Sequence, residues 1–109
     1  MYGSLAPRDV LSGYASGMAK LDEAAIQAAL AAVPEWTRDG DTLRRQFTLG
    51  SFPDAIAFVT RLAFDAQAVD HHPDIVINYK RVTLSFTTHS EGGLTKKDFD
   101  GARAVDKLV

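Results

Sequence analysis

The sequence contains two pairs of β-prone segments, and a connection of only a few residues joins the members of each pair. In the first pair, Asp39-Gly40-Asp41 separates residues 36–38 from residues 43–49, and Asp-Gly between such segments is a hairpin signal. In the second pair, residues 75–79 and 82–88 are rich in β-branched and aromatic side chains, which favour strands. The pattern therefore predicts two antiparallel hairpins.

Three other segments are predicted to be helical. Residues 22–32 are rich in good helix formers, and Pro34 ends this segment. A second helix begins after the capping residue Ser51 and runs to about Val69, and a third begins after Thr95 and runs to about Leu108. The apolar spacing of the second helix predicts a buried face made of Phe52, Ile56, Val59, Leu62 and Ala63, flanked by Phe58 and Phe64.

The predicted order of elements is α-β-β-α-β-β-α, which favours an α+β fold. We expect a two-layer sandwich with one four-stranded antiparallel sheet and three helices on one of its faces. The other face and the sheet edges would then be free for a partner subunit. Residues 1–17 are rich in Gly, Ser and Ala and show no period, so we expect a flexible N-terminal tail before a single domain at residues 18–109.

Composition limits the classes of function. The chain has 109 residues and a formal net charge of −2, which gives no support to a nucleic-acid partner. It has no cysteine, so disulfides and cysteine-based zinc sites are excluded, and a reducing, cytoplasmic setting fits. No apolar run is long enough to predict a membrane span. A domain of this size has a modest core, which favours burial of surface in an oligomer.

All three histidines of the chain lie close together in the sequence. His71 and His72 are adjacent at the predicted turn between a helix and a strand, and His89 follows the last predicted strand. If the last two strands form a tight hairpin, His89 lies opposite roughly position 72, and the three imidazoles share one pocket at the end of the sheet. Asp98, in the first turn of the last helix, is placed to accept a hydrogen bond from one of them.

This pattern permits more than one interpretation. Imidazoles titrate near neutrality, so the group suits proton transfer. Three histidines and an aspartate could also bind a transition metal, although adjacent histidines tend to point apart and no histidine pair has helical i, i+4 spacing. Asp98 could serve only as a capping residue, and a histidine at a turn is often simply solvated.

The motif Asp70-His71-His72-Pro73, followed by Tyr79, Thr88-His89 and Asp98, resembles the pterin-4a-carbinolamine dehydratases. The resemblance extends from Leu21 to Leu108. It implies the same α+β fold, assembly into dimers or tetramers, and dehydration of 4a-hydroxytetrahydropterin to quinonoid dihydropterin. This reaction recycles the cofactor of aromatic amino acid hydroxylases, and the resemblance implies neither a metal nor a cofactor in the dehydratase itself.

The resemblance also implies roles for individual residues. Catalysis is expected from His71, His72 and His89, support from Asp98, and contacts to the pterin substrate from Asp70, Pro73, Thr87 and Thr88. The chain departs from the family at two positions. Gln67 stands where the family often has a carboxylate and cannot titrate, and Ile75 stands where it often has an aromatic ring. A non-catalytic pterin-binding or protein-binding dimerisation cofactor on the same scaffold is the alternative function.

Overall fold

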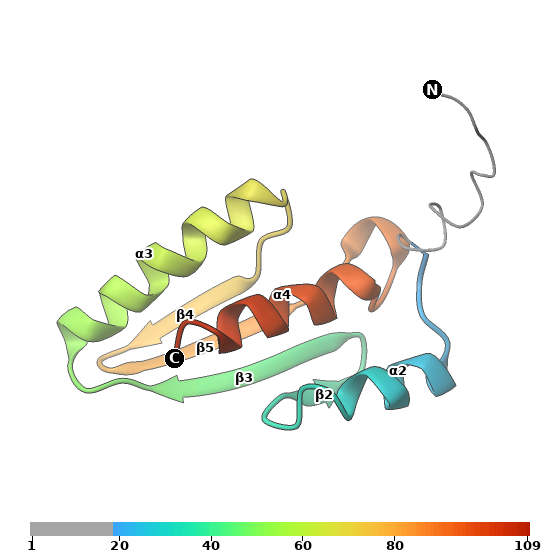
Figure 1. The fold of residues 1–109 in the computed structure, drawn as a ribbon, viewed down its shortest axis with the longest axis horizontal. Coiled ribbons are helices and arrows are strands. Elements are labelled where there is room, and N and C mark those ends of the chain that lie inside the picture. The colour runs from blue at the N-terminus through green and yellow to red at the C-terminus, as the bar shows by residue number, and fades with distance from the viewer. Residues whose placement is uncertain (1–18) are drawn as a thin grey trace.

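A computed structural model describes residues 19–109, and the expected tail at residues 1–17 lies outside this range. The order of elements is α-β-β-α-β-β-α, as predicted, with one short 3₁₀ helix added before the last helix (Figure 1). The elements are α2 (Glu23–Leu30), β2 (Thr37–Asp39), β3 (Thr42–Thr48), α3 (Phe52–Ala68), β4 (Asp74–Asn78), β5 (Arg81–Phe86), η1 (His89–Glu91) and α4 (Lys96–Asp106).

The four strands form one antiparallel sheet in the order β2-β3-β5-β4. Both predicted hairpins are confirmed, because Asp39 pairs with Thr42 and Asn78 pairs with Arg81 across two-residue turns. Pairing of β3 with β5 joins the hairpins at the centre of the sheet. The chain thus brings the start of β4 and the end of β5 to the same end of the sheet.

The hydrophobic core lies between one face of the sheet and the three helices. Alternating side chains of the two central strands supply the sheet side of this core: Leu43, Phe47, Val82, Leu84 and Phe86. Each helix begins at a capping side chain, which satisfies backbone N–H groups that have no partner within the helix. Asp22 caps α2, Ser51 caps α3 and Thr95 caps α4, the last with Asp98 in a capping box.

The predicted buried face of α3 is wrong in most of its members. The residues that the structure buries are Ala55, Phe58, Leu62 and Ala66. Phe52 and Ile56, expected inside, are 48% and 40% exposed. Apolar residues occur on two sides of this helix, so periodicity alone could not decide which side contacts the sheet.

No helix within residues 19–109 is long and apolar enough to cross a membrane.

Candidate active site

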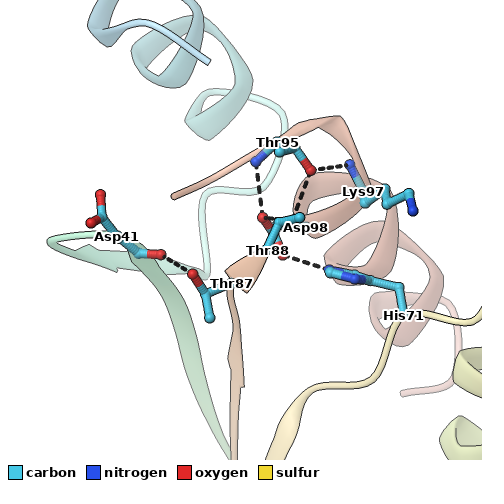
Figure 2. Close-up of polar contacts among 7 residues, drawn as sticks. All are labelled: Asp41, His71, Thr87, Thr88, Thr95, Lys97 and Asp98. Atoms are coloured by element: carbon cyan, nitrogen blue, oxygen red, sulfur yellow. Dashed lines mark hydrogen bonds and ion pairs between the residues drawn. The ribbon is translucent and has the colours of Figure 1, made fainter. Parts of the chain in front are cut away.

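The candidate site lies at one end of the sheet, between the end of α3, the end of β5 and the start of α4 (Figures 1 and 2). His71 and His72 precede β4, and His89 follows β5, so all three histidines lie at this end. The observed register differs from the expected one. The turn between β4 and β5 lies one residue earlier than expected, with Asn78 paired to Arg81, and the strand pairing ends at Asp74 and Ser85, before His89 in η1.

The end of α3 directs the two histidines. Val69 is its C-cap and Asp70 has a left-handed backbone with φ of 51°. The N–H groups of Asp70 and His71 donate to the carbonyls of Gln67 and Ala66, which is the Schellman arrangement. A non-glycine residue in this conformation is uncommon and costs about 1 kcal/mol or more. The sharp turn it makes separates the adjacent side chains, so His71 enters the protein and His72 remains exposed.

His71 forms a buried pair with Asp98. The distance between His71 Nε2 and Asp98 Oδ1 is 2.6 Å, and the two side chains are 11% and 0% exposed. The imidazole also stacks on Phe86, with 5.8 Å between ring centroids and 17° between planes. Carboxylates that contact a histidine in this way hold the ring in one orientation and one tautomer. Asp98, which the sequence predicts to hold one of the histidines, thus contacts His71.

Further donors hold the second oxygen of Asp98 (Figure 2). The Thr88 hydroxyl and the Thr95 backbone N–H each donate to Oδ2 over 2.9 Å. Two donors therefore point at one oxygen of a fully buried carboxyl group whose other oxygen faces the imidazole, which is what an ionised carboxylate needs away from water. Because an ionised carboxylate only accepts, the hydrogen shared with His71 belongs to Nε2, and Nδ1 is the nitrogen left for other contacts.

The other two histidines are on the surface. His72 Nε2 lies 2.9 Å from Gln67 Oε1, and this contact is exposed to solvent. His89 is exposed in η1, within a loop closed by pairing of Thr88 with Gly93. Within residues 19–109, no group of three or more His, Cys, Asp or Glu side chains is arranged to hold a metal ion.

The four residues expected to contact substrate lie in different surroundings. Asp70 is exposed beside the histidines, and Pro73 is buried in the wall of a groove. The Thr87 hydroxyl donates to the Asp41 carbonyl over 2.6 Å, which ties the end of β5 to the β2–β3 turn. The Thr88 hydroxyl is buried and already engaged with Asp98.

A groove of about 500 Å³ lies between α3 and α4, next to His71. Its size falls in the range of small-molecule pockets. Its walls are mostly apolar, and Asp65 and Asp100 supply carboxylates. Gly101 allows α4 to approach the sheet here, since a Cβ at this position would lie 2.7 Å from Phe86 Cε1.

Sequence reasoning missed two contributors to this site. Phe86 supports the His71 ring, and the Thr95 hydroxyl reaches the Thr88 hydroxyl over 2.8 Å. The capping box at Thr95 and Asp98 was visible in the sequence, but it indicated only the start of a helix. The contact of its carboxylate with a histidine was also expected, but the sequence did not indicate that the partner would be His71.

Comparison with known protein families identifies a match that covers most of the chain. Residues 19–108 match the family described as pterin 4 alpha carbinolamine dehydratase. A relative from Roseiflexus sp. (strain RS-1) is 51% identical over 90 residues, covering 83% of this chain and 97% of the relative. One from Mycobacteroides abscessus is 52% identical over 92 residues, covering 84% and 98%. Both relatives carry provisional assignments as pterin-4-alpha-carbinolamine dehydratases.

Solved structures show the same fold. A transcriptional coactivator/pterin dehydratase from Brucella melitensis superimposes with a TM-score of 0.79 at 32% identity, covering 82% of this chain and 97% of that one. A pterin dehydratase-like protein that is a RuBisCO assembly factor in the alpha-carboxysome has a TM-score of 0.55 at 23% identity, and this likeness concerns the fold alone.

Proposed function

Because the chain belongs to the pterin-4-alpha-carbinolamine dehydratase family, we propose that it removes water from 4a-hydroxytetrahydropterin to give quinonoid dihydropterin. The observation that carries this proposal is the buried contact between His71 and Asp98 at the edge of a ligand-sized groove. A fully buried carboxylate that orients an imidazole is an arrangement suited to proton transfer.

The reaction requires two proton transfers. A proton is delivered to the 4a-hydroxyl oxygen, the C4a–O bond breaks and water leaves. The N5–H proton is removed, and its electron pair forms the C4a=N5 double bond. Imidazoles exchange protons at neutral pH, and positioned acid and base groups typically contribute about 10²–10⁴-fold.

We assign these transfers to the three histidines. With Nε2 of His71 committed to Asp98, its Nδ1 is the nitrogen that can exchange a proton with a ligand. His72 and His89 are exposed at the same end of the sheet, where either can supply the second group. In this proposal Gln67 orients His72 through a neutral hydrogen bond and takes no part in proton transfer.

We place the pterin ring in the groove between α3 and α4. The apolar walls suit a flat bicyclic ring, and the carboxylate of Asp65 can accept a hydrogen bond from its amino group. In this placement Pro73 and Asp70 lie near the ligand, whereas the buried Thr88 hydroxyl supports Asp98. The physiological setting that we propose is recycling of the pterin cofactor of aromatic amino acid hydroxylases.

The test is the rate of dehydration in a coupled hydroxylase assay that contains a chelator. The informative variant is His71→Gln, because the glutamine amide can still donate to Asp98 but cannot transfer protons. We expect acceleration by the unaltered protein and a loss of about 10²-fold or more in the variant. Equal rates with and without the folded protein would refute the dehydratase proposal.

We also propose that the chain self-associates through β4. This strand lies at the edge of the sheet, and all five of its residues are exposed. Its centre is Ile75-Val76-Ile77, with none of the lysines or prolines that usually protect an edge strand. Antiparallel pairing with β4 of a second copy would satisfy this edge and cover these side chains.

Sedimentation measures this self-association. Val76 is 61% exposed in the single chain, so Val76→Lys should be tolerated by the monomer and should break the assembly. Thr48→Lys, at an exposed position on β3, is the matched control and should remain associated. A monomeric unaltered protein at micromolar concentration, or an unchanged assembly in Val76→Lys, would contradict pairing through β4.

A protein-binding role without catalysis is the second candidate. It is favoured by large apolar side chains on the surface of α3 and just beyond its end, of which Phe64 is 74% and Val69 65% exposed. Such exposure is typical of interaction surfaces. Under this alternative His71→Gln would leave partner binding unchanged, and no dehydration would be measured for either protein.

A further inference from the structure

We propose that Thr88 and Thr95 are positioning residues for the His71–Asp98 pair, linked by their hydroxyl groups into one directed chain of hydrogen bonds. The catalytic consequence rests on the proposed dehydratase activity, whereas the structural consequence does not. The hydroxyl of Thr95 lies 2.8 Å from that of Thr88, which donates to Asp98 Oδ2 over 2.9 Å. All three side chains are buried, with exposures of 5% or less.

The direction of each bond follows from the carboxylate. The Asp98 carboxylate only accepts hydrogen bonds, so the single hydroxyl hydrogen of Thr88 is donated to Oδ2 of Asp98. Thr88 must then accept in its contact with Thr95, whose own hydroxyl hydrogen points toward Thr88. Thr95 Oγ1 accepts in turn from the Lys97 backbone N–H over 3.2 Å. The chain therefore runs from the backbone of α4, through two threonines, to Oδ2 of Asp98.

These hydrogen bonds determine the orientation of the Asp98 carboxyl group. Oδ2 receives the Thr88 hydroxyl and the Thr95 backbone N–H, which come from two different segments of the chain. With Oδ2 held from two sides, Oδ1 is directed at His71 Nε2. Loss of the Thr88 donor would leave the buried carboxylate with two donors and free it to rotate, and the imidazole would lose its fixed partner.

Helix capping alone does not explain this arrangement. A capping box needs Thr95 and Asp98, which are both in or next to the first turn of α4. Thr88 lies outside the helix, just after β5, and is not a member of the capping box, although its hydroxyl contacts both capping side chains. Its hydroxyl links the β5–η1 connection to the carboxylate, so the same aspartate both starts a helix and orients a histidine.

The test compares Thr88→Val with two variants of Thr95. Thr88→Val preserves shape and removes the donor, while both capping residues, Thr95 and Asp98, are left unchanged. Thr95→Ser keeps the hydroxyl, whereas Thr95→Val removes it. Thr83→Val is the matched control, because it makes the same change in β5 on the face of the sheet away from the core. The measurements are the imidazole ¹⁵N chemical shifts of His71, which report its tautomer, together with kcat, KM and the pH profile of kcat.

We expect Thr88→Val and Thr95→Val to reduce the Nε2–H tautomer of His71, to lower kcat about tenfold and to alter the pH profile while KM is retained. Thr95→Ser and Thr83→Val should match the unaltered protein. An unchanged tautomer and pH profile in folded Thr88→Val, or equal losses in the two Thr95 variants, would overturn the inference. If the unaltered protein shows no dehydration, the proposed function fails, and the ¹⁵N shifts alone decide whether the threonines position the pair.

Discussion

The change Asp98→Asn separates the two tasks of this carboxyl group. Asparagine has nearly the same shape, but it offers one oxygen and one NH₂ group. The oxygen must face Thr88 and the Thr95 backbone N–H, because the opposite orientation would bury donors against donors. The NH₂ group then faces His71 Nε2, which must accept, so the ring hydrogen moves to Nδ1.

The size of the effect follows from burial. Hydrogen bonds to charged groups contribute about 1.5–3 kcal/mol, and Asp98 is fully buried, so we expect a loss of roughly this amount in the free energy of unfolding. In a domain of this size 1 kcal/mol corresponds to a change of about 4–8 °C in Tm. Because the free nitrogen of His71 now carries a hydrogen and cannot accept a proton, kcat should fall about 10²–10⁴-fold.

The assay measures Tm by calorimetry and kcat by coupled dehydration. Asp106→Asn is the control, since Asp106 is also on α4 and accepts from Trp36 and Arg45, each over 2.8 Å, far from the histidines. It should lower Tm and leave kcat unchanged. If Asp98→Asn keeps the kcat of the unaltered protein, Asp98 does not determine the tautomer of His71 and our reasoning is wrong.

Three further changes test other parts of the structure. Gly101→Ala places a Cβ against Phe86, which should lower the free energy of unfolding in urea by about 1–3 kcal/mol. The better helix propensity of alanine offsets up to about 1 kcal/mol of this loss. Unchanged stability would contradict the close approach of α4 to Phe86. Ala104→Trp fills the groove and should raise KM about tenfold or more with kcat retained, and an unchanged KM would place the pterin elsewhere. The hydrogen bond from Arg38 lowers the pKa of Glu23 from its usual value of 4.5, so the stability lost in Glu23→Gln should be present in Tm above pH 4.5 and should vanish as pH falls through the lowered pKa. A difference in Tm that persists in stronger acid would contradict the pairing.

The fold could be predicted largely because its signals are local. Asp39-Gly40-Asp41, the residues around Tyr79 and the capping residues each act within a few positions. They predict both hairpins and the helix starts, although the turn at Tyr79-Lys80 lies one residue earlier than expected. The rotation of α3 could not be predicted in the same way. This helix has two apolar sides, and which of them contacts the sheet depends on which side chains fit the sheet and on what covers the exposed side.

The candidate site also combines features that the sequence predicted with features that it could not predict. The sequence indicated a histidine group and a nearby aspartate, but it treated His71, His72 and His89 as equivalent. The structure distinguishes them, because the left-handed turn at Asp70 sends His71 inward and leaves His72 at the surface. The partners of His71, Asp98 and Phe86, come from segments that are distant in the chain.

The sequence by itself determined the order of helices and strands, the two hairpins, the caps and the inventory of groups that can exchange protons. Propensities and caps depend on neighbours within one or two turns, so they can be read along the chain. The tertiary structure decided which histidine is buried, which side of α3 faces the sheet and that the Thr88 hydroxyl supports Asp98. These features depend on burial and on donors brought together from separate segments, and packing of the whole domain creates both.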